Sequence, residues 1–333
     1  MSLQVTPARS LFVALGMLVL PAFAALSEIG QPASPILVSD DGISLIDSKT
    51  LSRRWQRLQG EQTFEPAIAA GRILVSSSRG LYAIDRRQGD ILWRLPDKQL
   101  GFTPVIDGDA VYLASRDGRL TAIDSRQGGV IWETALQGWV YPPALAGELL
   151  FTGGSDATLW AIERGSGRVA WSRPLGQEMV YSPVALADGR IVVTTFDREI
   201  ISFNQAGQLL WRQRYPAILK TPIVTDEGLI FSGMDQVLRA VDGGSGRLLW
   251  QQRLPQPLAA ELGYQRGLIL AALENGDIWL IDSSRGTLQQ AYHIPRESVA
   301  TPRFSGERLL GFIHAFGGPK AVVATRLEQS NRK

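Results

Sequence analysis

A tryptophan returns about every 39 residues, and this repeat constrains the fold more than any other feature of the sequence. The six members of the series are Trp55, Trp93, Trp132, Trp171, Trp211 and Trp250. Each one closes a phrase of short apolar runs separated by turn residues, as in the stretch from Pro104 to Trp132. Such a phrase is typical of an antiparallel meander, and a unit of about 39 residues holds about four strands, the size of one β-propeller blade.

The number of units predicts how many blades the propeller has. A seventh unit ends at Gln290, where the pattern expects tryptophan, and an eighth begins at Thr301-Pro302 and fades towards the end of the chain. Eight such units need about 312 residues, slightly more than the chain offers after its first 24. We therefore predict an all-β fold, with a single domain over residues 25–333 and about eight four-stranded blades. Seven blades is the alternative.

Two further positions of the repeat lie at turns. When the units are aligned, the position in the turn after the second strand is occupied by Gly42, Gly80, Gly118, Ala157, Arg198, Gln236 and Gly276. Because three of these are not glycine, the column suggests a turn that tolerates several backbone geometries. An aspartate follows at Asp47, Asp85, Asp124, Asp242 and Asp282. Its return in most units favours a turn-capping role over a single catalytic constellation.

The first 24 residues have a different character. Arg9 precedes an apolar run from Leu11 to Leu20, which is followed by Pro21 and the triplet Ala22-Phe23-Ala24. This order predicts a cleavable secretory signal over residues 1–24 and hence a periplasmic protein. A retained membrane anchor is the alternative, although the run is well short of the roughly 20 residues that a spanning helix needs.

Composition limits the chemistry open to the chain. There is no cysteine, so disulfides, thiolate nucleophiles, cysteine-bound metal and a lipid-anchored cysteine are all excluded. The formal net charge is only +2, with the basic residues spread through the turns. Nucleic-acid binding favours a basic stripe with interleaved aromatics, and we expect no nucleic-acid partner.

Two segments resemble a known repeat family. The stretches "VYLASRDGRLTAIDSRQGGVIW" (Val111 to Trp132) and "ILVSSSRGLYAIDRRQGDILW" (Ile73 to Trp93) are similar to PQQ-type propeller repeats. The likeness is strong over residues 35–282. It implies that the periodic tryptophans are structural docking residues that pack between neighbouring blades. It also leaves two branches of function, quinone-dependent dehydrogenases and scaffolds of the BamB type, which take part in outer-membrane β-barrel assembly.

The residues favour the scaffold branch. A quinoprotein site needs a hard cation with about six to eight oxygen ligands and a pocket for a planar cofactor, whereas the patterned carboxylates here belong to every blade. The inserts between blades are too short for a cofactor lid. We therefore expect no catalytic, cofactor-binding or metal residues and no cofactor. A PQQ-dependent dehydrogenase is the runner-up, and a small-molecule-sensing propeller with a deep polar channel is the third hypothesis.

The links between blades give the candidate binding residues. Two places before each blade's opening proline the chain carries an aromatic residue in four successive units, Phe64, Phe102, Tyr141 and Tyr181, and then Lys220. Apolar residues of the same links join this column. The predicted partner-binding set is Trp139, Tyr141, Met179, Tyr181, Leu219 and Lys220. Either these side chains form an exposed apolar patch on one rim, or they fold beneath the rim and seal adjacent blades.

These observations together predict a non-catalytic periplasmic scaffold that binds a protein partner. The resemblance implies a membrane or envelope protein as that partner and envelope or outer-membrane protein assembly as the role. It also implies binding through loops around the middle blades. The chain itself is expected to lack a lipid anchor, so any attachment to the outer membrane would pass through the partner.

Overall fold

The computed structural model describes residues 36–39, 42–47, 52–69, 71–96, 102–179, 181–293, 299–305, 308–313 and 322–326. The predicted signal segment, residues 1–24, lies outside them. Within these ranges no helix is long and apolar enough to cross a membrane.

The described residues form eight antiparallel sheets, which we number as blades 1 to 8 in chain order. Blade 1 contains β1 (Ile36–Ser39), β2 (Gly42–Ile46) and β3 (Arg53–Arg57). Blade 2 contains β4 (Ala67–Ala69), β5 (Arg72–Ser77), β6 (Gly80–Asp85) and β7 (Ile91–Pro96). Blade 3 contains β8 (Val105–Asp107), β9 (Ala110–Ala114), β10 (Arg119–Asp124) and β11 (Val130–Ala135). Blade 4 contains β12 (Ala144–Ala146), β13 (Leu149–Gly153), β14 (Thr158–Glu163) and β15 (Val169–Pro174).

The second half of the chain repeats this order. Blade 5 contains β16 (Val184–Ala185), β17 (Ile191–Thr194), β18 (Glu199–Phe203) and β19 (Leu209–Arg214). Blade 6 contains β20 (Ile223–Thr225), β21 (Gly228–Ser232), β22 (Val237–Val241) and β23 (Leu248–Arg253). Blade 7 contains β24 (Gly263–Gln265), β25 (Leu268–Ala272), β26 (Asp277–Asp282) and β27 (Leu288–His293). Blade 8 contains β28 (Val299–Ser305), β29 (Arg308–Ile313) and β30 (Val322–Arg326).

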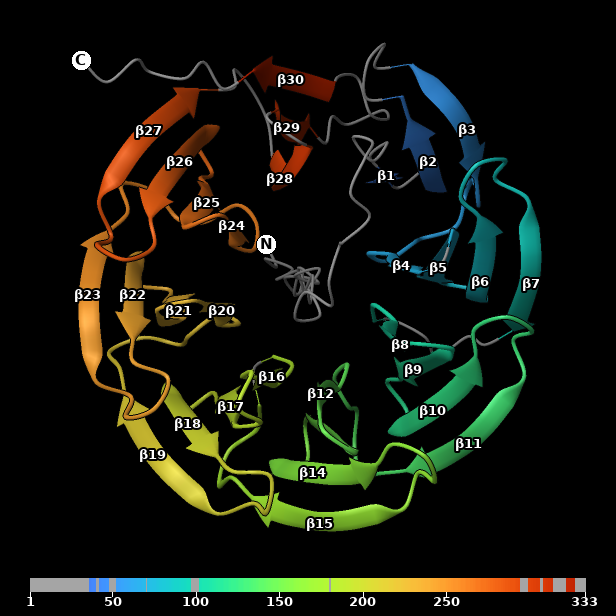
Figure 1. Ribbon diagram of the computed structural model, residues 1–333, viewed down its shortest axis with the longest axis horizontal. Coiled ribbons are helices and arrows are strands. Elements are labelled where there is room, and N and C mark those ends of the chain that lie inside the picture. Colours follow the sequence, from blue (N-terminus) through green and yellow to red (C-terminus); the bar gives the residue numbers. More distant parts are fainter. Residues whose placement is uncertain are drawn as a thin grey trace, which may run out of the picture.

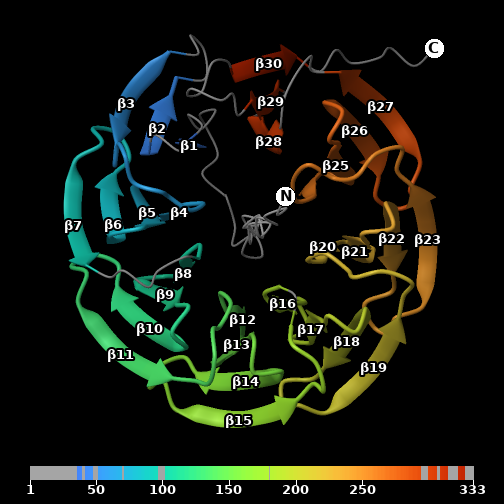
Figure 2. The ribbon, with the colours of Figure 1, turned by 180° about the vertical axis from the view of Figure 1, so that it is seen from behind.

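The blades stand in a ring, with the first strand of each four-stranded blade towards the centre and the last on the circumference (Figure 1). Both views place blade 8 beside blade 1, where the ring closes (Figure 2). The prediction of an all-β propeller of about eight blades is confirmed. Six blades have four strands as expected, whereas three strands are described in each of blades 1 and 8.

The core lies between neighbouring blades. The second and third strands bury almost every side chain, as in β5 and β6, because both faces of each sheet are covered by an adjacent sheet. The outermost strands alternate between exposed and half-buried residues, as in β7 and β11. Between blades 1 and 7, clusters of buried apolar side chains therefore fill the interfaces of neighbouring blades, and they end at the circumference.

The periodic tryptophans join each blade to the next. Every indole Nε1 donates a hydrogen bond of 2.8–3.1 Å to a backbone carbonyl in the last turn of the following blade. The acceptors are, in chain order, Arg86, Ser125, Arg164, Gln205, Gly243 and Ser283. A glycine of that turn faces the ring so closely that a Cβ at Gly167 would lie 2.5 Å from Trp132. The glycine and the tryptophan of adjacent repeats thus form one contact.

The turn between the second and third strands keeps a single handedness. All seven aligned residues have a positive φ, including Ala157 (57°), Arg198 (65°) and Gln236 (61°). The φ values nevertheless extend from 57° at Ala157 to 147° at Gly80, and the turn before Gly80 is tighter than the one before Arg119, so more than one turn geometry occurs, as the column suggested. Strand pairing on both sides fixes the sign of φ, so the side chain accepts the left-handed conformation at some cost.

The recurring aspartates cap the turn between the third and fourth strands. The Asp85 carboxylate accepts hydrogen bonds from the backbone N–H groups of Arg87 and Gln88 at 2.9 and 2.7 Å. Asp124 repeats the pair of bonds one blade later. The carboxylate therefore satisfies backbone donors of the turn that presents the docking glycine.

Candidate functional site

One rim of the ring is built from two kinds of segment in each blade: the turn between the second and third strands, and the link that enters the blade. Backbone hydrogen bonds join them. The Ser155 N–H donates to the Trp139 carbonyl at 3.2 Å in blade 4, and the Phe196 N–H donates to the Glu178 carbonyl at 3.1 Å in blade 5. The Met234 N–H donates to the Ile218 carbonyl at 2.9 Å in blade 6. We call this surface the rim.

Four of the six predicted partner-binding residues are buried beneath the rim. Tyr141, Met179, Tyr181 and Leu219 are each at most 3% exposed. The expectation that they form an exposed apolar patch is wrong, and the alternative, that they seal adjacent blades, describes them. The physical reason is that each link crosses from one blade to the next, so a side chain directed into the ring is enclosed by both.

The contacts of these residues show the sealing role. The Tyr141 ring meets Phe102, from the link into blade 3, edge to face at a centroid distance of 5.6 Å. Met179 of blade 5 packs onto Gly153 of blade 4, where a Cβ would lie 2.5 Å from the Met179 Sδ. Burial raises the pKa of the Tyr141 hydroxyl to about 12, so this phenol stays neutral at physiological pH.

The other two predicted residues differ from these four. Trp139 is 42% exposed on the rim of blade 4, with its ring 6.5 Å from Tyr141. Lys220 is half-buried, and its Nζ donates to the Leu258 carbonyl at 3.2 Å in the link of blade 7. Trp139 alone of the predicted set combines a large apolar side chain with substantial exposure.

Two rim residues were missed from the sequence. Phe196 is 43% exposed in the turn of blade 5, and Met234 is 57% exposed in the equivalent turn of blade 6. The same turn position carries Ser78, Arg116, Ser155 and Glu274 in other blades. In the sequence, both stand out as large apolar residues at a repeat position that is polar in those other blades, and this contrast could have identified them. We call Trp139, Phe196 and Met234 the rim patch; they come from three successive blades.

Ion pairs hold the turns that present this patch. The residue after Met234 is Asp235, which pairs with the buried guanidinium of Arg239 at 2.5 Å. Burial acts to raise the pKa of Asp235, but the hydrogen bond and charge of Arg239 outweigh it and lower the pKa below its ordinary value. In blade 5, Asp197 follows Phe196 and pairs with Arg214 at 2.8 Å. Phe196 and Met234 therefore each lie in a turn that is held by an ion pair.

Tyr181, Lys220 and Glu261 lie in the links that enter blades 5, 6 and 7. Burial raises the pKa of Glu261 to about 7, and the nearby charge of Lys220 opposes this shift. Burial also raises the pKa of Tyr181, with a further contribution from the Glu261 charge. Groups from the links into three successive blades thus act electrostatically on one another.

Metal binding and small-ligand binding by the described residues are the other functions to consider. The described side chains contain no group of three or more histidine or acidic residues placed to hold a metal ion. One open hollow of about 300 Å³ lies between residues 188–190 and 204–206 of blade 5. Its arginine, Arg190, is bonded to Asp188 and to the Gly243 carbonyl. The hollow therefore has no free charged group to recognise a ligand.

Comparisons with known proteins agree with this architecture. A family model described as outer membrane protein assembly factor BamB matches residues 9–173 and 173–333. The crystal structure of BamB from Moraxella catarrhalis is similar, with a TM-score of 0.67 and 17% identity, over 84% of this chain and 93% of that one. The computationally designed Ika8 protein is also similar, with a TM-score of 0.71 and 14% identity, over 84% and 90%. No curated protein matches the sequence.

Proposed function

The chain belongs to the BamB family of outer membrane protein assembly factors, and from this membership we propose that it is a non-catalytic scaffold for assembling proteins of the cell envelope. We place it in the periplasm, where it binds a membrane or envelope protein. The proposed binding surface is the rim of blades 4 to 6.

The observation that carries the proposal is the rim patch. Three large apolar side chains, Trp139, Phe196 and Met234, are each more than two-fifths exposed on one rim. Exposed apolar groups with a polar surround are typical of protein interaction sites, and aromatic residues and methionine are enriched in interface cores. The exposed polar neighbours Glu178 and Arg198 supply part of such a rim.

The rim patch is also rigid, which favours binding. Its turns are held by the Asp197–Arg214 and Asp235–Arg239 pairs, and Trp139 rests on buried Tyr141. A preorganised surface loses little conformational entropy when a partner docks. Tyr141, a buried member of the predicted binding set, therefore contributes indirectly by supporting Trp139.

The experiment is an affinity pull-down of the mature protein from its native envelope, repeated with the triple variant Trp139→Ser, Phe196→Ser, Met234→Ser. We expect the native protein to recover a stoichiometric envelope-protein partner and the variant to lose it. All three side chains are exposed, so circular dichroism and thermal unfolding should show a folded variant. Loss of exposed anchors costs typically more than 1 kcal/mol each at interface hot spots.

The matched control replaces exposed leucines on the circumference, Leu209, Leu210 and Leu248, by serine. It removes a similar amount of exposed apolar surface, and we expect it to keep the partner. Retention of the partner by the rim variant would disprove the rim as the binding site. Recovery of no partner by the native protein, together with saturable uptake of quinone and Ca²⁺, would favour the dehydrogenase instead.

A further inference from the structure

The circumference of the propeller consists of strand edges. In each four-stranded blade the last strand pairs with one neighbour only, so the backbone groups on its outer side have no ladder partner. Exposed edges of this kind accept strands from other chains, and proteins block them with cationic side chains or proline. The seven outermost strands of blades 1 to 7 can be compared for such blocking residues.

Six of these strands carry an exposed cationic or histidine side chain, and two of the six also contain proline. The blocking residues are Arg53, Arg54 and Arg57 in β3, Arg94 and Pro96 in β7, Arg173 and Pro174 in β15, Arg212 and Arg214 in β19, Arg253 in β23, and His293 in β27. The strand β11 reads Val-Ile-Trp-Glu-Thr-Ala and contains none. Among the outermost strands of blades 1 to 7, the edge of blade 3 is therefore the one with neither a cationic side chain nor proline, and its single charged residue is the acidic Glu133.

The exposed residues of β11 suit an added strand. Val130 and Ile131 are 52% and 54% exposed. Ile131 is the bulge residue of the strand and has no register partner on β10. At the other end the Leu136 N–H donates to the Gly118 carbonyl within the blade, so strand alternation directs the N–H groups of Glu133 and Ala135 outward. The edge thus offers both apolar contact and backbone donors.

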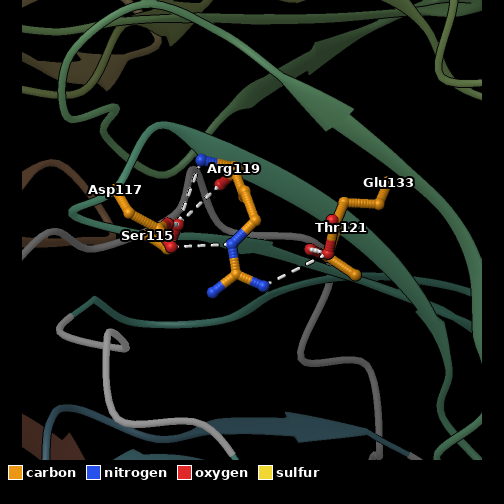
Figure 3. A network of polar contacts seen from close by, with 5 residues as sticks. All are labelled: Ser115, Asp117, Arg119, Thr121 and Glu133. Carbon is orange, nitrogen blue, oxygen red and sulfur yellow. Dashed lines mark hydrogen bonds and ion pairs between the residues drawn. The ribbon is translucent and has the colours of Figure 1, made fainter.

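Charge at this edge points to a cationic occupant. Arg119 lies between two carboxylates, with its Nε 2.8 Å from Asp117 and its Nη1 3.3 Å from Glu133 (Figure 3). Thr121 Oγ1 also approaches Glu133 at 3.3 Å. Two carboxylates therefore share the Arg119 guanidinium. A lysine or arginine on an added strand would give Glu133 a second cationic partner.

We propose that β11 binds an extended segment of a partner protein, which adds as a fifth strand to blade 3. The segment carries alternating apolar residues that contact Val130 and Ile131, and a basic residue that meets Glu133. Backbone hydrogen bonds supply affinity and the alternate side chains supply selectivity, as in other cases of strand addition. This surface lies on the circumference and is independent of the rim proposed above.

The test uses a capped hexapeptide that alternates valine and lysine, titrated into the full-length protein. We expect saturable binding that slows amide hydrogen exchange of Glu133 and Ala135 at least tenfold, followed by NMR. The double variant Val130→Lys, Ile131→Lys adds the missing blocking residues and should weaken binding at least tenfold. The matched control, Leu248→Lys with Leu249→Lys on β23, should leave binding unchanged.

A second substitution keeps the test decisive if the double variant fails to fold. Glu133→Lys reverses the charge of the edge and should shift preference from the valine–lysine peptide to a valine–glutamate peptide. Equal binding of both peptides to the native protein, or no protection at Glu133 and Ala135, would overturn the proposal. A dimer seen by sedimentation without peptide and abolished by the double variant would identify a second copy as the occupant, and would also overturn it.

Discussion

At the scale of single residues, the turn between the second and third strands shows how a repeat fixes the backbone more strictly than the side chain. Gly118 has a φ of 85°, and a Cβ there would lie 2.4 Å from the Gly138 carbonyl oxygen. Gln236 occupies the equivalent turn with a φ of 61° and retains its side chain. The two positions share a conformation but differ in the space around them.

This difference predicts opposite effects of two substitutions. Gln236→Gly relieves left-handed strain of about 1–2 kcal/mol, and the greater freedom of glycine in the unfolded chain offsets about 0.4–1 kcal/mol of it. We expect a net gain of roughly 0.5–1 kcal/mol in the free energy of unfolding, measured by urea denaturation. Gly118→Ala should lose about 1–3 kcal/mol through steric overlap. A loss of stability in Gln236→Gly would mean that the glutamine side chain has a role beyond the turn.

At the scale of elements, the fourth strand of one blade and the last turn of the next form the recurring joint. Trp132 on β11 donates to the Arg164 carbonyl at 3.0 Å and stacks against Gly167, while its ring lies 5.9 Å from Tyr112. The Trp132 side chain supplies both a hydrogen bond and ring packing across this joint. Its removal should therefore weaken the union of blades 3 and 4.

We expect Trp132→Ala to lower the free energy of unfolding by about 3–5 kcal/mol, as for other large aromatic truncations. Trp132→Phe keeps much of the ring but loses the hydrogen bond, which is worth about 1 kcal/mol. Chemical denaturation of both variants checks the order. If the phenylalanine variant were as unstable as the alanine variant, the hydrogen bond and not the packing would dominate the joint.

The elements also show how far sequence reasoning extends. The tryptophan period and the turn residues were sufficient to predict the strands, their order and the approximate blade number, because each repeat is specified locally. Whether a link residue is exposed depends on how two blades meet. Trp139 and Tyr141 are two residues apart, yet one is exposed and the other buried. Phe196 and Met234 lie in the turns, so the aromatic column of the links gives no signal for them.

At the scale of the whole molecule, the least stable interface between two blades determines where the ring opens first. In blades 1 to 6 the last strand carries a tryptophan that packs against the following blade. Blade 6 pairs Ala240 with Trp250, whereas the equivalent pair in blade 7 is Leu280 with Gln290. A glutamine buries less apolar area than an indole, so the junction between blades 7 and 8 should open more readily than the junctions that a tryptophan joins.

Native-state hydrogen exchange can locate this opening, because local openings have smaller free energies than global unfolding. We expect amides of β27 to exchange at least tenfold faster than those of β23, a difference of about 1.4 kcal/mol. The two strands have the same length and equivalent places in their blades, so unequal exchange reports on the junction. Equal protection would mean that blade 8 holds blade 7 without a tryptophan, through the contacts between β25 and β28.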